Sequence, residues 1–235
     1  MRIRAYSFTP RLVPTLAAAA MIALTLALGR WQTERAQEKE AKQALYEARL
    51  REPPVLLSGA NSSAEPLLYR RARASGRWIA EGQIFIDNQI HEGRAGFHVV
   101  TPLRLEGTPR VVLVNRGWIE RTRAYPQAPA VEVPAGNIAL TGLATVPPTR
   151  VLELSTDTVA GNVWQNLSIE RYQRQSGLSV LPIVILADIS ADGLAAIDEK
   201  PDTGIAKHRE YALTWFSLAA TVMALWVGLN VRKNR

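Results

Sequence analysis

The sequence predicts a membrane protein with two transmembrane α-helices, one near each terminus, that flank a mainly β domain. Three observations carry this prediction: two uncharged apolar runs, tails that contain only basic charges, and a series of short strand-like segments between the runs. The chain has 235 residues, which is enough for one domain of ordinary size and two spans.

The first apolar run extends from Leu12 to Leu28 and contains no charged residue. At about 1.5 Å per residue it measures roughly 25 Å as a helix, near the lower limit for a span. We assign residues 12–29 to the first transmembrane helix, followed by Trp31 where an interfacial aromatic anchor is expected. The alternative is a cleaved signal peptide, for which Ala27-Leu28-Gly29 would be a poor cleavage site.

The second apolar run extends from Tyr211 to Leu229, also without a charge, and precedes a basic tail. These features favour a second transmembrane helix, residues 211–229, over a buried core helix. The tails 1–11 and 230–235 carry six cations and no anion. The positive-inside rule therefore places both tails in the bacterial cytoplasm and residues 30–210 in the periplasm, with the inner membrane as the lipid bilayer that is spanned.

The charge of the region between the runs narrows the class of function. It carries 22 cations and 21 anions, so almost all of the net charge of +7 lies on the tails, and we expect no nucleic-acid partner. The chain has no cysteine, which excludes disulfides, thiol catalysis and cysteine-ligated metal sites. The remaining residues form no recognisable catalytic set, so we do not expect an enzyme.

A helical stem is expected directly after the first span. Residues 30–52 contain neither Pro nor Gly, and Pro53-Pro54 ends them. Ser168 is expected to cap a short helix that stops at Gly177. Runs with alternating or β-branched residues predict strands at 73–79, 83–90, 97–105, 110–119, 138–146, 163–165 and 181–186. Many short strands with one helix indicate an α+β domain built as a small antiparallel barrel or sandwich.

Of the three histidines, His208 is the strongest candidate for chemistry, because it lies three residues before the second span. On a helix, His208, Trp215 and Trp226 fall within about 40° of one another. An imidazole beside membrane-embedded aromatic rings can be an axial ligand of haem iron. The alternative is an interfacial histidine that is solvated or bonded to backbone. His91 and His98 flank a possible turn and could bind a metal, but two histidines without a third ligand are more often surface or satisfied residues.

Two further arrangements involve arginines. Trp31 and Arg35 are four residues apart on the stem and can stack as a cation–π pair, unless Trp31 is only a membrane anchor. In the run Asn115-Arg116-Gly117-Trp118, the glycine allows a β-bulge beneath which the tryptophan can pack. Arg116 is then expected to be free to hold an anion.

Four segments together resemble the motifs of one family. Residues 28–35 read LGRWQTER, residues 96–103 read GFHVVTPL, residues 114–119 read VNRGWI and residues 208–216 read HREYALTWF. In this order, and between two terminal spans, they resemble the surfeit-locus family of cytochrome c oxidase assembly proteins in its bacterial form. The likeness runs through nearly the whole chain, and the ordered set is more specific than any single motif.

The resemblance implies a chaperone of the respiratory chain that helps to mature subunit I of a haem–copper terminal oxidase. In bacterial members it implies binding of haem a as a transient cargo, with the second-span histidine, here His208, as the favoured ligand. No metal other than the haem iron is implied, and subunit I and haem a synthase are the implied partners. Haem or partner contacts are implied at the other matching positions: Trp31, Gln32, Arg35, Arg116, Tyr211 and Trp215.

The chemistry of haem a is compatible with this interpretation. The ring is apolar and its propionates are charged, so a site at the membrane face can bury the ring while Arg35 or Arg209 meets the propionates. Two alternatives remain. One is a membrane-anchored scaffold that stabilises subunit I without binding haem, and the other is a haem-modifying membrane enzyme, for which no catalytic set is found.

Overall fold

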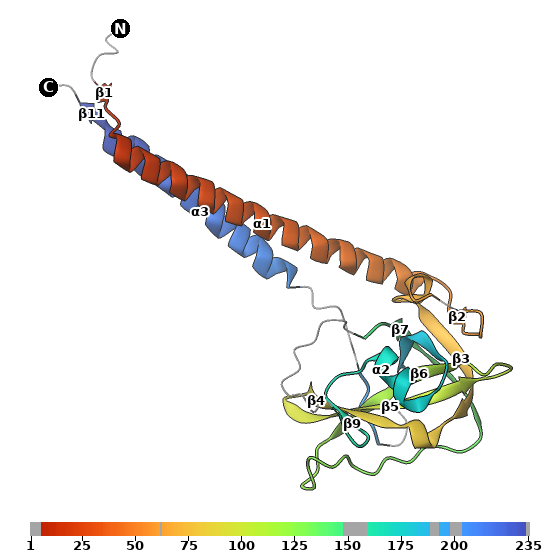
Figure 1. Ribbon diagram of the computed structural model, residues 1–235. Helices are drawn as coiled ribbons and strands as arrows, with labels where there is room; N and C mark the ends of the chain where they lie inside the picture. Colours follow the sequence, from red (N-terminus) through yellow and green to blue (C-terminus); the bar gives the residue numbers. More distant parts are fainter. Residues whose placement is uncertain (1–5, 62, 148–158, 189–192, 198–203, 234–235) are drawn as a thin grey trace. The chain divides into compact units, whose positions relative to one another are not determined.

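The computed structural model describes residues 6–61, 63–147, 159–188, 193–197 and 204–233 (Figure 1). The chain divides into two compact units. One is helical and comprises Met1–Leu45 and Pro201–Arg235, and the other comprises Tyr46–Lys200 and contains the main sheet. Each unit is described by itself.

The helical unit is built from two long helices. α1 (Leu12–Arg51) covers the first apolar run and the stem without a break, and Pro14 lies in its first turn, where a proline costs a helix least. α3 (Ile205–Asn230) contains the second apolar run. Both helices are long and apolar enough to cross a membrane. The predicted pair of apolar helices, one near each end of the chain, is therefore confirmed.

Two short strands pair at the end of the unit where α1 begins and α3 ends. β1 (Tyr6–Phe8) pairs antiparallel with β11 (Val231–Lys233), and Phe8 meets the Trp226 ring edge-on at 5.4 Å between centroids. The predicted cytoplasmic tails fall partly on residues 1–5 and 234–235, which lie outside the described residues. The side of the membrane on which the tails lie stays a prediction.

The unit Tyr46–Lys200 is mainly β, as predicted. Its nine-stranded sheet has the order β2-β3-β7-β10-β6-β5-β4-β9-β8, and β3 pairs in addition with β5. Two 3₁₀ turns, Glu65–Leu67 and Ala80–Gly82, flank β3. The strands are β2 (Val55–Leu56), β3 (Arg71–Trp78), β4 (Ile84–His91), β5 (Arg94–Leu105), β6 (Val111–Glu120), β7 (Asn137–Thr145), β8 (Val159–Ala160), β9 (Val163–Trp164) and β10 (Val180–Ala187). The finer prediction of a barrel or sandwich stays a prediction.

The expected antiparallel arrangement holds for most strand pairs of the sheet, but three pairs among the described strands are parallel. β6 pairs in parallel with β10, and β2–β3 and β4–β9 are also parallel pairs. A parallel pair needs a long crossover connection, whereas consecutive strands with short turns form antiparallel pairs. The connection from β6 to β10 contains β7 and a helix, and this is long enough to return the chain in the same direction.

That helix, α2 (Ile169–Ser176), covers one face of the sheet. Ser168 caps it by accepting a hydrogen bond from the Arg171 amide at 3.2 Å, and Gly177 ends it in the left-handed region at φ +68°, both as predicted. Tyr172 of α2 is buried against the sheet in a cluster with Leu113 and Trp164. The opposite face of β6 and β10 forms the larger core cluster, which includes Val112, Val114, Leu181, Ile183 and Ile185.

A β-bulge interrupts β6 at Arg116. The register with β5 passes from Val99 opposite Gly117 to Val100 opposite Asn115, so Arg116 has no partner in the ladder. Gly117 has φ +144°, which favours glycine at this position. The predicted bulge is confirmed, and the Trp118 side chain is buried beside it with its indole N–H donating to the Gln89 carbonyl at 2.9 Å.

Candidate functional site

The candidate site lies on the helical unit, where α1 and α3 run side by side in opposite directions (Figure 1). Small residues line the contact: Thr25, Gly29 and Ala36 on α1, and Ala212 and Ala219 on α3, are buried. A Cβ atom at Gly29 would lie 2.7 Å from the Phe216 ring, so any larger residue at this position would force that ring to move. Small residues allow two helices to pack closely in the apolar interior of a membrane.

His208 and Gln32 meet across this contact. His208 lies in the first turn of α3, and its Nδ1 is 2.7 Å from Oε1 of Gln32 on α1. An amide oxygen only accepts hydrogen bonds, so Nδ1 of His208 is the donor and carries the proton. In that tautomer the Nε2 lone pair is available to a ligand, and a hydrogen bond on the other ring nitrogen is the usual support of a metal-bound histidine.

The antiparallel register of the two helices explains why these residues meet. Near the start of α1 and the end of α3, the Trp226 indole N–H donates to Oγ1 of Thr15 at 3.1 Å. The step along α1 from Thr15 to Gln32 is matched by a step of nearly equal length back along α3, from Trp226 to His208. Arg209, the next residue of α3, also reaches α1 and pairs with Glu40 at 2.8 Å, further along α1 than this register alone would place it.

The predicted cation–π pair of Trp31 and Arg35 is wrong. Among the described residues, Arg35 pairs instead with Glu38 at 2.7 Å, and the Trp31 side chain is half exposed. A carboxylate one turn away on the same helix is in reach of the guanidinium and attracts it more strongly than a ring face does. The exposed Trp31 is compatible with the alternative of an interfacial anchor.

Tyr211 and Trp215 continue the His208 face of α3. They follow the histidine at i+3 and i+7, so all three side chains lie on one side of the helix. Tyr211 is exposed and Trp215 is partly buried. An imidazole with a free nitrogen next to aromatic rings is a side-chain set that can hold a haem.

Arg116 is the predicted contact residue that lies elsewhere, in the unit Tyr46–Lys200. Its side chain is buried, and Nη1 donates to the side-chain oxygen of Gln83 at 3.1 Å and to the carbonyl of Glu132 at 3.0 Å. Arg116 was expected to be free to hold an anion, but its guanidinium is buried and already hydrogen-bonded. The bulge turns the side chain inward, and burial of a charged group requires hydrogen-bond partners.

The two remaining histidines belong to the β4–β5 hairpin. His91 lies against the Trp118 ring at 5.1 Å between centroids, and His98 stands opposite Trp118 in the ladder. Groups of three side chains suited to a metal are not found among the described residues. Burial of the ring, with the nearby His91 as the smaller cause, lowers the pKa of His98 to about 4.

This low pKa predicts acid destabilisation of the β unit. Unfolded His98 takes up a proton near pH 6.5, whereas the folded ring does so only near pH 4, so the free energy of unfolding falls as the pH drops between these values. We expect a loss of about 3 kcal/mol by pH 4 from this group. Urea unfolding of the full chain in detergent at several pH values measures it. His98→Gln is expected to flatten the profile, and an unchanged profile would contradict the assignment.

Sequence reasoning did not anticipate the Gln32–His208 bond. The family motif marked Gln32 as a contact position without giving it a role, and His208 was expected to be a ligand, solvated or bonded to backbone. The sequence did contain a signal for this contact. If the two spans run antiparallel, the end of the first span, just before Trp31, lies level with the start of the second span, at Tyr211. This alignment places residues just outside each span at the same level, and so brings Gln32 near His208.

Comparison with known proteins gives a consistent result. The model of the SURF1 family matches residues 19–220. A SURF1-like protein of Monosiga brevicollis is 27% identical over 88% of this chain and 84% of its own length. Surfeit locus protein 1 of Mus musculus is 26% identical over 90% of this chain and 74% of its own length. A SURF1-like protein of Rickettsia felis is 26% identical over 87% of this chain and 91% of its own length.

Proposed function

The chain belongs to the SURF1 family, and we propose from this that it is an assembly factor for a haem–copper terminal oxidase which binds haem a and assists its insertion into subunit I. The observation that carries the haem step is the hydrogen bond between His208 and Gln32. It supports a fixed ring with Nε2 available to the iron.

The donor set of the helical unit fits a haem. His208 supplies the nitrogen ligand, and Tyr211 and Trp215 supply aromatic surface beside it. The propionates need cations, and Arg209 and Arg35 form ion pairs in which both arginine side chains are exposed, by 68% and 51%. Exposed ion pairs contribute little free energy, so either arginine can exchange its glutamate for a propionate at small cost.

The site suits delivery better than permanent storage. Only His208 among the described residues of this unit offers an imidazole, and one axial ligand holds a haem less tightly than two. The proposed acceptor of the cargo is subunit I, and the proposed donor is haem a synthase. This is a chaperone's activity and requires no catalytic residue.

We further propose that α1 and α3 cross the bacterial inner membrane, with both ends of the chain in the cytoplasm and the β unit in the periplasm. Support comes from the length and apolar character of both helices and from the purely basic tails. His208 would then lie at the periplasmic face of the bilayer, beside the start of the second apolar run.

The test is the absorption spectrum of the chain purified in detergent from cells that make haem a. A haem a spectrum at close to one haem per chain is the expected result. Cells that lack haem a synthase provide the control, which should yield a chain without this spectrum. A haem-free chain from both cell types would overturn haem delivery and favour the scaffold that stabilises subunit I.

A further inference from the structure

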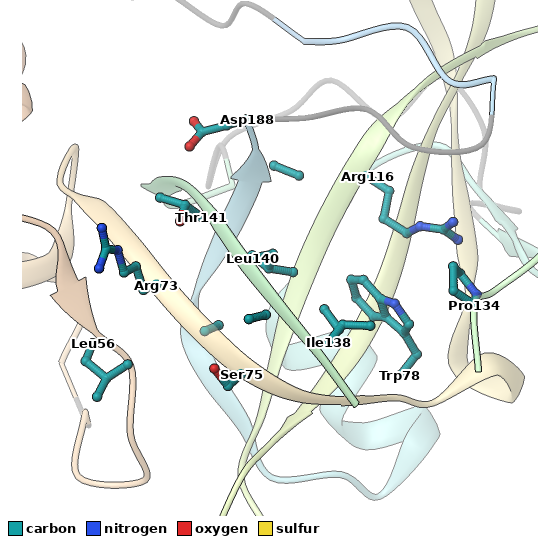
Figure 2. A pocket seen from close by; sticks show the side chains of 13 residues that line it. Leu56, Arg73, Ser75, Trp78, Arg116, Pro134, Ile138, Leu140, Thr141 and Asp188 are labelled. Carbon is teal, nitrogen blue, oxygen red and sulfur yellow. The ribbon is translucent and has the colours of Figure 1, made fainter. Parts of the chain in front are cut away.

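The cavities of the two units differ in the charge of their walls. Figure 2 shows a cavity of the β unit whose lining carries charges of both signs, with Arg73 and Arg116 as cations and Asp188 as a carboxylate. The helical unit contains a smaller cavity, of about 380 Å³, between the start of α1 and the end of α3. The charged residues in its described lining are two arginines, Arg11 and Arg232. The charge of this second wall is therefore positive.

The sequence excludes a carboxylate side chain near these two arginines. Residues 1–33 and 211–235 contain no aspartate or glutamate, so neither tail can supply one. The nearest acidic residues along the two helices are Glu34 on α1 and Glu210 on α3. At about 1.5 Å per residue, each lies roughly 30 Å or more along its helix from the cavity. Within the helical unit, the two guanidinium groups therefore have no carboxylate partner and favour an external anion.

Apolar side chains of both helices form the rest of the wall. Pro14 and Ala18 contribute from α1, and Val222, Leu225 and Leu229 contribute from α3. Leu225 and Leu229 are 58% and 79% exposed. Both belong to the second apolar run, so lipid acyl chains cover them if α3 crosses a membrane. A ligand that combines an apolar tail with an anionic group therefore fits this wall better than a free anion does.

Hydrogen bonds hold the polar end of the cavity in place. Asn230 is only 8% exposed, and its side-chain N–H donates to the Trp226 carbonyl at 2.7 Å. The Asn230 carbonyl accepts from the Thr9 amide at 2.9 Å. A side-chain amide has two N–H groups, so Asn230 has a second donor to offer a ligand. The cavity is thus formed before a ligand binds, which reduces the ordering entropy lost on binding.

We propose that this cavity binds an anionic phospholipid of the cytoplasmic leaflet, whose headgroup phosphate meets Arg11 and Arg232 and whose acyl chains lie along the leucines. The inference rests on the proposed crossing of the membrane, which places the end of α3 at the cytoplasmic face. Guanidinium groups form paired hydrogen bonds with phosphate, and this leaflet carries a negative surface potential. The cavity lies at the opposite end of α3 from His208, so lipid binding is independent of haem binding.

The test is a competition between two lipids for the full chain. The chain is stripped of lipid in a nonionic detergent and given equal amounts of dioleoyl phosphatidylglycerol and dioleoyl phosphatidylcholine. These lipids share their acyl chains and phosphate group but differ in net charge. Native mass spectrometry should find about one phosphatidylglycerol per chain, retained roughly tenfold or more in preference to phosphatidylcholine. Excess inorganic phosphate should not displace it, because free phosphate has no apolar part.

Two neighbouring cations provide a matched pair of variants. Arg232 and Lys233 are successive residues of β11, so their side chains leave the strand on opposite faces, and of the two only Arg232 lines the cavity. Arg232→Gln is expected to lower the preference for phosphatidylglycerol roughly fivefold. Lys233→Gln removes the same charge and should change the preference less than about twofold, as expected for a cation outside the site. Thermal unfolding in detergent checks that both variants are folded.

Three results would each overturn the lipid site: equal retention of the two lipids, displacement of phosphatidylglycerol by inorganic phosphate, or equal effects of the two variants. The proposed topology has a separate readout, because the chain has no cysteine of its own. Ser7→Cys is expected to react with a membrane-impermeant maleimide only after spheroplasts are lysed. Reaction in intact spheroplasts would overturn the proposed orientation, and with it the assignment to the cytoplasmic leaflet.

Discussion

A His208→Ala variant, purified from cells that make haem a, is expected to lose most of the haem a absorption that the wild-type chain carries. The methyl group of alanine cannot bind iron, and the unit offers no second imidazole among its described residues. The measurement is the ratio of haem absorption to protein in matched detergent preparations. A variant that carries as much haem as the wild type would exclude His208 as the ligand while leaving haem binding itself intact.

Gln32 provides a sharper pair of variants at the same site. Gln32→Leu removes the acceptor of the Nδ1 proton and is expected to lower haem affinity roughly 10- to 100-fold, the usual cost of losing a residue that supports a metal ligand. Gln32→Glu keeps an acceptor and makes the imidazole more basic. We therefore expect it to retain haem and to lower the reduction potential of the bound iron.

A readout that needs no haem separates these roles. Nitrogen NMR of the histidine rings distinguishes the tautomer with the proton on Nδ1 from that with the proton on Nε2. Wild type and Gln32→Glu are expected to show His208 with the proton on Nδ1, whereas Gln32→Leu should show a mixture. Equal tautomer populations in wild type and Gln32→Leu would show that Gln32 does not orient the ring, whatever happens to haem.

Gly29→Leu is expected to produce the largest loss of stability in the helical unit. A side chain at this position would meet the Phe216 ring, whose nearest atom is 2.7 Å from the Cβ position, and overpacking of this kind costs about 1–3 kcal/mol or more. The variant should unfold at a lower temperature in detergent. It should also bind less haem, because Gln32 lies one turn from Gly29 and would be displaced from His208.

The chain provides its own controls for this prediction. Gly228→Leu places the same side chain on α3 where nothing lies within 4 Å of the Cβ position, and it is expected to leave the unfolding temperature nearly unchanged. Phe216→Ala, added to Gly29→Leu, removes the ring that is in the way and should restore part of the stability. Equal effects of the two leucines would show that α1 and α3 do not approach at Gly29.

The sequence determined the parts of this protein that depend on local patterns. Two uncharged runs predicted two apolar helices, and alternating segments predicted the strands of a mainly β region. Ser168 and Gly177 marked the ends of α2, and Gly117 marked the bulge in β6. Each of these features follows from neighbours along the chain, because apolar periodicity, caps and left-handed glycines act over a few residues.

Only the tertiary structure decided which distant residues meet. The parallel pairing of β6 with β10, the inward position of Arg116 and the pairing of Arg35 with Glu38 all differ from expectation. The bond between Gln32 and His208 joins residues 176 positions apart. Such contacts depend on helix register, strand order and competition between several possible partners, and a pattern read along one chain does not contain these quantities.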